Sequence, residues 1–194
     1  MTKKKKARKK VYARKRAIGI DIGQILLKQR HLFLTDVIDA GLMNKIIQEM
    51  YALDTLNHKP IVLAINSPGG SVSAGMAIID AMRAVKSPVI TFVTGQACSM
   101  AAIISVCGNK RFMTQNSIWM AHPMSAGVID YTTFMRDRMK GLDLFERIMD
   151  DVLKKQTKLT AEEIASTSRG EMWLTSQECL KKGIVDAVIL GEKR

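Results

Sequence analysis

Short apolar runs alternate along this chain with segments in which apolar residues recur every three or four positions. The short runs predict buried strands, because both faces of such a strand must meet apolar partners. They lie at residues 31–35, 61–65, 89–93, 117–121 and 184–190. The helical spacing predicts helices at residues 38–53, 71–85, 99–106, 130–155 and 176–182, and a capping box at Thr160 opens another short one. Strands that alternate with helices predict an α/β fold with a parallel sheet, wound in successive repeats.

The charge of the chain is concentrated at its start. Residues 1–16 hold ten basic residues and no acidic one, whereas the remaining 178 residues hold 20 basic and 18 acidic ones. We therefore expect a polybasic, disordered or axial tail over residues 1–16, followed by one domain over residues 17–194, since no linker interrupts residues 28–190. Such a tail can bind nucleic acid through its phosphates, but a solvated arm is the commoner outcome of a charge run, and we favour it.

Composition narrows the class of protein further. No uninterrupted apolar stretch approaches the roughly 18–20 residues that a membrane span requires. No apolar segment suited to a secretory signal follows the basic tail. The three cysteines (Cys98, Cys107 and Cys179) are too few and too widely spaced for a disulfide scaffold or a zinc knuckle. We expect a soluble, cytoplasmic protein with no membrane contact, no bound metal and no cofactor.

Two predicted turns at strand ends have unusual compositions. Ligands of α/β sheets bind where strands end and helices begin. The turn at residues 66–70 (NSPGG) joins a proline to two glycines, which lets the backbone approach a ligand closely. The turn at residues 94–98 leads into Ser99, at the start of an apolar helix. Position alone favours a helix-capping role for Ser99, but a helix N-terminus with apolar walls would also stabilise an oxyanion.

A serine nucleophile needs a base, and the chain has three histidines. His31 precedes a strand and His58 lies in a polar turn, so only His122 follows a buried strand at the same edge of the sheet as Ser99. A single histidine at a strand end is more often structural. Its combination with Ser99 favours catalysis, because a Ser–His pair is the minimum for nucleophilic acyl transfer. The third member would be a carboxylate, which spacing alone does not choose.

Six fragments resemble, in order, the proteolytic subunit of Clp protease. They are residues 65–72 (INSPGGSV), 95–101 (GQACSMA), 111–112 (RF), 116–117 (NS), 120–122 (MAH) and 183–186 (GIVD). The resemblance covers residues 28–190 and implies a crotonase-like fold of repeated ββα units, with a protruding handle helix at residues 130–155. It also implies a serine endopeptidase that cleaves unfolded polypeptides, forms a homo-oligomer of stacked seven-subunit rings around a closed chamber, and works with an AAA+ unfoldase.

The same resemblance assigns roles to particular residues. It implies that Ser99 is the nucleophile, that His122 is the general base, and that the backbone N–H groups of Gly69 and Met100 form the oxyanion hole. The family's triad aspartate falls on Glu171, and the arginine that helps its rings interlock falls on Gly170. The aromatic residues of its unfoldase-docking pocket fall on Val62, Ala64 and Ala84.

These departures keep two alternatives open. Glu171 and Gly170 motivate a catalytically silent ring subunit or adaptor that assembles with an active paralogue. The crotonase-like fold motivates an acyl-CoA enzyme, which would use a similar oxyanion hole with carboxylates as acid and base. Cys98 would be the better nucleophile if its pKa were lowered. We interpret it as a packing residue, because the family has a small residue there.

Overall fold

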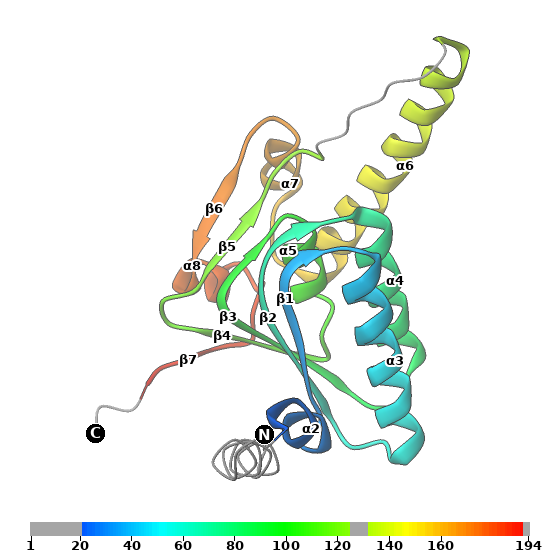
Figure 1. Ribbon diagram of the computed structural model, residues 1–194. Coiled ribbons are helices and arrows are strands. Elements are labelled where there is room, and N and C mark those ends of the chain that lie inside the picture. Colours follow the sequence, from blue (N-terminus) through cyan, green and yellow to red (C-terminus); the bar gives the residue numbers. More distant parts are fainter. Residues whose placement is uncertain (1–20, 125–131, 192–194) are drawn as a thin grey trace, which may run out of the picture.

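A seven-stranded sheet organises the part of the chain that this computed structural model describes, residues 21–124 and 132–191 (Figure 1). Five strands pair in parallel in the order β1 (His31–Ile38), β2 (Ile61–Gly70), β3 (Val89–Cys98), β4 (Lys110–Thr114) and β7 (Ala187–Ile189). β5 (Ile118–Ala121) pairs in parallel with the end of β3, and β6 (Met172–Thr175) pairs antiparallel with β5. The basic tail predicted over residues 1–16 lies outside the described residues.

The helices cover this sheet unevenly. They are α2 (Ile22–Lys28), α3 (Ala40–Leu56), α4 (Val72–Ala84), α5 (Met100–Ser105), α6 (Thr132–Gln156), α7 (Ala161–Thr167) and α8 (Ser176–Lys181). α3 and α4 pack side by side, and α5 contacts β2, β3, β5, α4 and α6. α6 extends well beyond the rest of the described chain (Figure 1). No helix within the described residues is both long and apolar enough to span a membrane.

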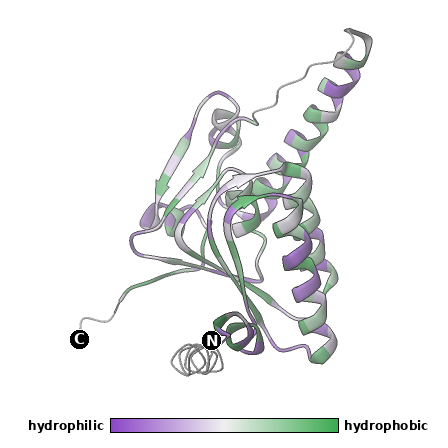
Figure 2. Cartoon of the chain, in the orientation of Figure 1, coloured by the Kyte–Doolittle hydropathy of each residue, from purple (hydrophilic) through white to green (hydrophobic). Residues whose placement is uncertain are grey.

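The predicted core strands form the core. Leu32, Leu34, Ile61, Leu63 and Ile65 are at most 1% exposed. Figure 2 shows the central strands in the hydrophobic colour, while polar residues lie along the outer surface of α3. The capping box predicted at Thr160 is confirmed, and a second one at Thr175 begins α8.

Two predicted turns are wrong, because both segments are strand ends. The ladder between β2 and β3 continues past an irregularity between Ile65 and Ser67 rather than stopping there. Gly95 has a φ of +105°, and a Cβ there would lie 2.7 Å from the Asn66 side chain, so glycine lets β3 bend without leaving the sheet. The first half of β3 therefore pairs with β4 and its end pairs with β5.

Other boundaries also differ from the sequence prediction. β4 and β6 are strands that the apolar pattern did not predict, since they are short and partly exposed. The strand predicted at residues 184–190 is confined to β7, although Ile184 and Val185 are buried. The predicted helix at residues 130–155 is confirmed from Thr132 onward, and residues 130–131 lie outside the described part.

Candidate active site

Ser99 occupies a sharp connection between β3 and α5. Its φ of 55° and ψ of −125° put a residue other than glycine in a sparsely populated backbone region. Its hydroxyl makes no capping hydrogen bond to α5, so the helix-capping role that position alone favours is wrong. A strained residue between a strand and a helix, with its hydroxyl unused by the helix, is typical of a presented nucleophile.

Two neighbouring strands enclose this connection. A Cβ at Gly69 of β2 would lie 2.7 Å from both the Cys98 carbonyl oxygen and the Ser99 Cβ, and Gly69 has a φ of +96°. Only glycine therefore lets β2 pass so close to the connection. On the other side, the Ser99 N–H donates a hydrogen bond of 2.8 Å to the Met120 carbonyl oxygen of β5.

His122 follows directly after β5, which is fixed against α5. The buried Trp119 donates its indole N–H to the Ala102 carbonyl oxygen at 3.3 Å. The imidazole and the Ser99 side chain consequently line the same pocket, at the convergence that the sequence predicts. Among the described residues no hydrogen bond joins the Ser99 hydroxyl to His122.

Glu171 lies immediately before β6. The antiparallel register pairs Met172 with Ala121 and so brings Glu171 across from His122. The Glu171 Oε2 accepts a hydrogen bond of 2.8 Å from the indole Nε1 of Trp173. Within the described chain, the Glu171 carboxylate makes no hydrogen bond or ion pair with His122. The strand pairing therefore brings the three predicted side chains to one edge, with the carboxylate turned to the tryptophan.

The sheet register distinguishes the N–H groups of Gly69 and Gly70, of which Gly69 is an expected oxyanion donor. The Gly69 N–H already donates to the Ser67 Oγ at 3.1 Å, and the pocket is lined by Gly70 rather than Gly69. Gly70 pairs with Ile38, whose carbonyl oxygen accepts from the Ser71 N–H. In a parallel ladder this arrangement turns the N–H of Gly70 itself away from β1. The N–H of Gly69, an expected donor, is thus already engaged, whereas that of Gly70 faces the side of β2 away from β1.

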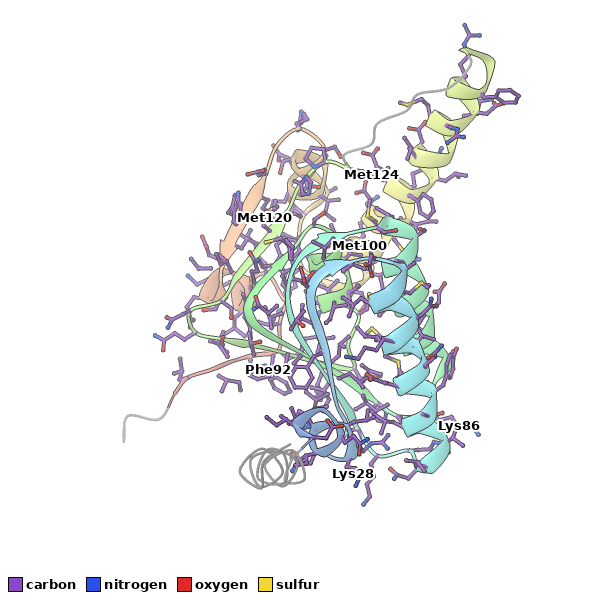
Figure 3. The ribbon with its side chains drawn as sticks, in the orientation of Figure 1. Lys28, Lys86, Phe92, Met100, Met120 and Met124 are labelled. Atoms are coloured by element: carbon purple, nitrogen blue, oxygen red, sulfur yellow. The ribbon has the colours of Figure 1, made fainter. Side chains whose placement is uncertain are left out.

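Met100 is the other expected donor. It is the first residue of α5 and is 1% exposed. The N–H of a first helical residue has no acceptor inside its own helix. Met100 also lines the pocket beside Ser99. Figure 3 shows Met100 at the same end of the sheet as Met124, a residue that follows β5.

Cys98 is a packing residue in this arrangement, as interpreted from the sequence. Its side chain is buried, and its thiol donates to the Gln96 Oε1 at 3.6 Å. Burial raises the pKa of the Cys98 thiol, and the negative charge of Glu171 raises it further. A thiol held in its protonated form is a poor nucleophile.

The pocket beside Ser99 has a volume of about 180 Å³. Its apolar walls include Val72, Met100 and Ile103, and α6 contributes Glu146 and Asp150 to the lining. These two carboxylates were not expected as site residues from the sequence. The available signal was two acidic residues spaced four apart beside the apolar stripe of α6, a pattern that is usually a solvated helix edge.

The chain is similar to known proteins over most of its length. The family model described as Clp protease matches residues 14–192. The chain is 37% identical over 174 residues to the ATP-dependent Clp protease proteolytic subunit of Lactococcus lactis subsp. cremoris, covering 87% of each chain. It is 35% identical over 173 residues to proteolytic subunit 1 of Protochlamydia amoebophila, covering 87% of this chain and 84% of the relative. The Streptococcus sanguinis subunit is 37% identical over 174 residues, with 87% and 89% covered.

Proposed function

The chain belongs to the Clp protease family, with the crotonase-like fold of its members, and from this premise we propose that it is the proteolytic subunit of an ATP-dependent protease. It is a serine endopeptidase that cleaves peptide bonds of unfolded polypeptides. The observation that supports this function best is the strained Ser99 and the strand-end His122 on the walls of one pocket.

The proposed reaction uses Ser99 as the nucleophile and His122 as the general base. The imidazole takes the hydroxyl proton while the Ser99 Oγ bonds to the carbonyl carbon of the peptide. The backbone N–H groups of Gly70 and Met100 stabilise the negative charge that develops on the carbonyl oxygen. His122 then gives its proton to the leaving amine. Water, deprotonated by the same imidazole, hydrolyses the acyl-enzyme ester and restores the serine.

Glu171 is the proposed third member of the triad. A carboxylate beside the base holds the imidazole in its productive tautomer and stabilises the imidazolium that forms. Strand pairing supports this role, since Glu171 stands across from His122 in the register of β5 and β6. Before it can contact His122, the carboxylate must either break its hydrogen bond with the Trp173 indole or bind both groups at once.

Assembly is part of the proposal. α6 carries half-exposed apolar side chains, Phe134, Met139, Leu144 and Ile148, which are 48–58% exposed in the single chain. We assign α6 as the handle helix through which two stacked seven-subunit rings meet, since large exposed apolar side chains favour burial against another copy. The relatives are ATP-dependent Clp protease subunits by name, which supports an AAA+ unfoldase as partner.

Active-site labelling tests the proposal. A fluorophosphonate reacts with an activated serine, so the wild-type protein should be labelled at Ser99 and should cleave unstructured peptides. Ser99→Ala should abolish both, whereas Cys98→Ala is the matched neighbour control and should keep both. A wild-type protein that is neither labelled nor active as an assembled particle would contradict the proposal.

One observation favours a second function, a catalytically silent ring subunit. In the described residues the acid is hydrogen-bonded to Trp173, and no hydrogen bond joins the hydroxyl to the imidazole. A protein with this role would stay unlabelled alone and with an active paralogue, yet would enter mixed rings with it. Native mass spectrometry of the mixture, combined with labelling, separates the two functions.

A further inference from the structure

The pocket beside Ser99 is asymmetric in charge. Glu146 and Asp150 lie four residues apart on α6, so they occupy neighbouring positions on one helix face, and both line the pocket. No lysine or arginine is among the described residues that line it, and His122 is its one basic side chain. The α6 side of the described pocket lining therefore carries two carboxylates and no lysine or arginine.

These carboxylates make no hydrogen bond or ion pair with another described residue. Lys154, one turn further along α6, lies 3.9 Å from Asp151, and its positive charge also acts on Asp150 and offsets part of the rise in the pKa of that carboxyl. The pKa of Asp150 is raised, and burial is the largest cause of that shift. The negative charge of this carboxylate is therefore poorly solvated. A cation entering the pocket would relieve this penalty.

The other lining residues determine which kind of cation fits the pocket. Val72, Met100, Ile103, Met149 and Leu153 provide apolar walls, and the cavity volume of about 180 Å³ is below the roughly 300–1,000 Å³ of pockets for whole small-molecule ligands. A cavity of this size suits one side chain. Lysine and arginine combine an apolar stem with a charged end, which matches apolar walls that finish at carboxylates.

We propose that Glu146 and Asp150 make this site select a lysine or arginine side chain next to the bond that is cleaved. The inference rests on the proposed peptidase function and deepens it by naming the class of substrate. The aliphatic stem packs between the apolar walls, and the ammonium or guanidinium group pairs with the Asp150 carboxylate, with Glu146 beside it. The pairing orients the carbonyl carbon toward the Ser99 hydroxyl.

Matched peptides test this selection on the assembled full-length protein. A fluorogenic series differs at one residue beside the scissile bond, which is lysine, arginine, methionine, leucine or glutamate. We expect kcat/KM for lysine and arginine to exceed that for methionine and leucine by about tenfold, as one charge-assisted hydrogen bond allows. Glutamate should be the poorest, because its charge repels both carboxylates.

Three variants isolate the cause. Asp150→Asn keeps the shape and removes the charge, so it should lower the ratio of kcat/KM for the basic peptides to kcat/KM for the leucine peptide about tenfold. Glu146→Gln should act in the same direction with a smaller effect. Asp151→Asn is the matched control, because Asp151 is the adjacent acidic residue, is 61% exposed and does not line the pocket. It should leave the whole profile unchanged.

The outcomes distinguish this substrate selection from the proposed peptidase function on which it rests. A wild-type preference for leucine over lysine, or an equal loss for all peptides in Asp150→Asn, would overturn the selection while leaving the peptidase intact. A protein that cleaves no peptide and takes no fluorophosphonate at Ser99 would overturn both.

Discussion

At the end of the sheet marked by Lys28 and Lys86 in Figure 3, the buried guanidinium of Arg30 donates five hydrogen bonds, four to backbone carbonyl oxygens and one to the Ser87 hydroxyl. At the opposite end, Ser99 and His122 make no side-chain hydrogen bond within the described residues. At both ends, polar side chains lie beside strands of the same sheet. The Arg30 end uses all three guanidinium nitrogens to fix the chain, whereas the Ser99 and His122 side chains stay free to meet a substrate.

This contrast separates polar residues that stabilise from polar residues that react. A fully paired buried network resists change, because each group left without its partner would lose both its hydrogen bond and its solvation. A catalytic pair must exchange partners during each turnover, so it stays accessible and weakly held. Substitutions at the two ends should therefore affect different measurements.

The largest effect is expected from His122→Ala. Without the base, the Ser99 hydroxyl cannot lose its proton efficiently, and kcat/KM should fall by at least about 10⁴-fold. The free energy of unfolding should change by no more than about 0.5 kcal/mol, since no hydrogen bond within the described chain is lost. Peptide cleavage and urea unfolding measure the two quantities. A large loss of stability would show that the histidine is structural.

Arg30→Met should produce the opposite result. Removing the guanidinium leaves several buried carbonyl oxygens without donors and should lower the free energy of unfolding by about 3–5 kcal/mol. The folded fraction should react with a fluorophosphonate at the wild-type rate. Arg83→Met is the control, because Arg83 is 53% exposed and faces Asp80 at 3.7 Å, a surface pair that contributes little. Equal losses in the two variants would contradict this account of the Arg30 network.

Trp173→Phe tests the hydrogen bond between the Trp173 indole and the Glu171 carboxylate. Phenylalanine keeps an aromatic ring but lacks the indole N–H that holds Glu171. We expect the freed carboxylate to reach His122 more often and kcat/KM to rise about three- to tenfold, the equivalent of one modest hydrogen bond. The same substitution in a Glu171→Gln background should have no effect. A decrease in the single variant would show that the indole aims the carboxylate at the histidine.

The sequence predicted which residues meet at this edge better than their exact geometry. Ser99 and His122 were identified because each follows a buried apolar run, and such runs are easily recognised. The choice between the adjacent amides of Gly69 and Gly70 depends on strand register and on the Ser67 hydroxyl, neither of which apolar periodicity reveals. Glycines and a proline indicated turns at residues 66–70 and 94–98, but neighbouring strands kept both segments in the sheet.

Tertiary packing explains the remaining differences. β4 and β6 are short strands with exposed positions, and their pairing depends on neighbours that are distant in sequence. Glu146 and Asp150 become pocket residues only because α6 packs against α5, which brings a helix edge beside Ser99. Arg30 gave no sequence signal at all, although it is 8% exposed and joins four segments of the chain.

The smallest effect concerns the pH dependence of the Arg30 end. Asp54 Oδ1 accepts hydrogen bonds from the Ser87 hydroxyl at 2.7 Å and the Ser87 N–H at 2.8 Å, and His58 Nδ1 lies 3.1 Å away. Hydrogen bonding, first from the Ser87 hydroxyl, holds the pKa of Asp54 well below its usual value. A carboxyl whose pKa is lower in the folded state stabilises the fold above its unfolded pKa of about 3.9 and loses that contribution as the pH falls toward its folded pKa.

Urea unfolding between pH 6 and pH 3 measures this contribution. Asp54→Asn should lower the unfolding midpoint at pH 6 and flatten its decline toward pH 3, because the variant has no proton to take up at this site. Ser87→Ala should flatten the decline less, because it removes the hydroxyl hydrogen bond to Asp54 but keeps the one from the Ser87 N–H. The double variant should decline no more steeply than Asp54→Asn, which already lacks the carboxyl. Parallel declines in the wild type and both variants would mean that other carboxylates control the acid sensitivity, and the Arg30 network would then owe its stability to the guanidinium alone.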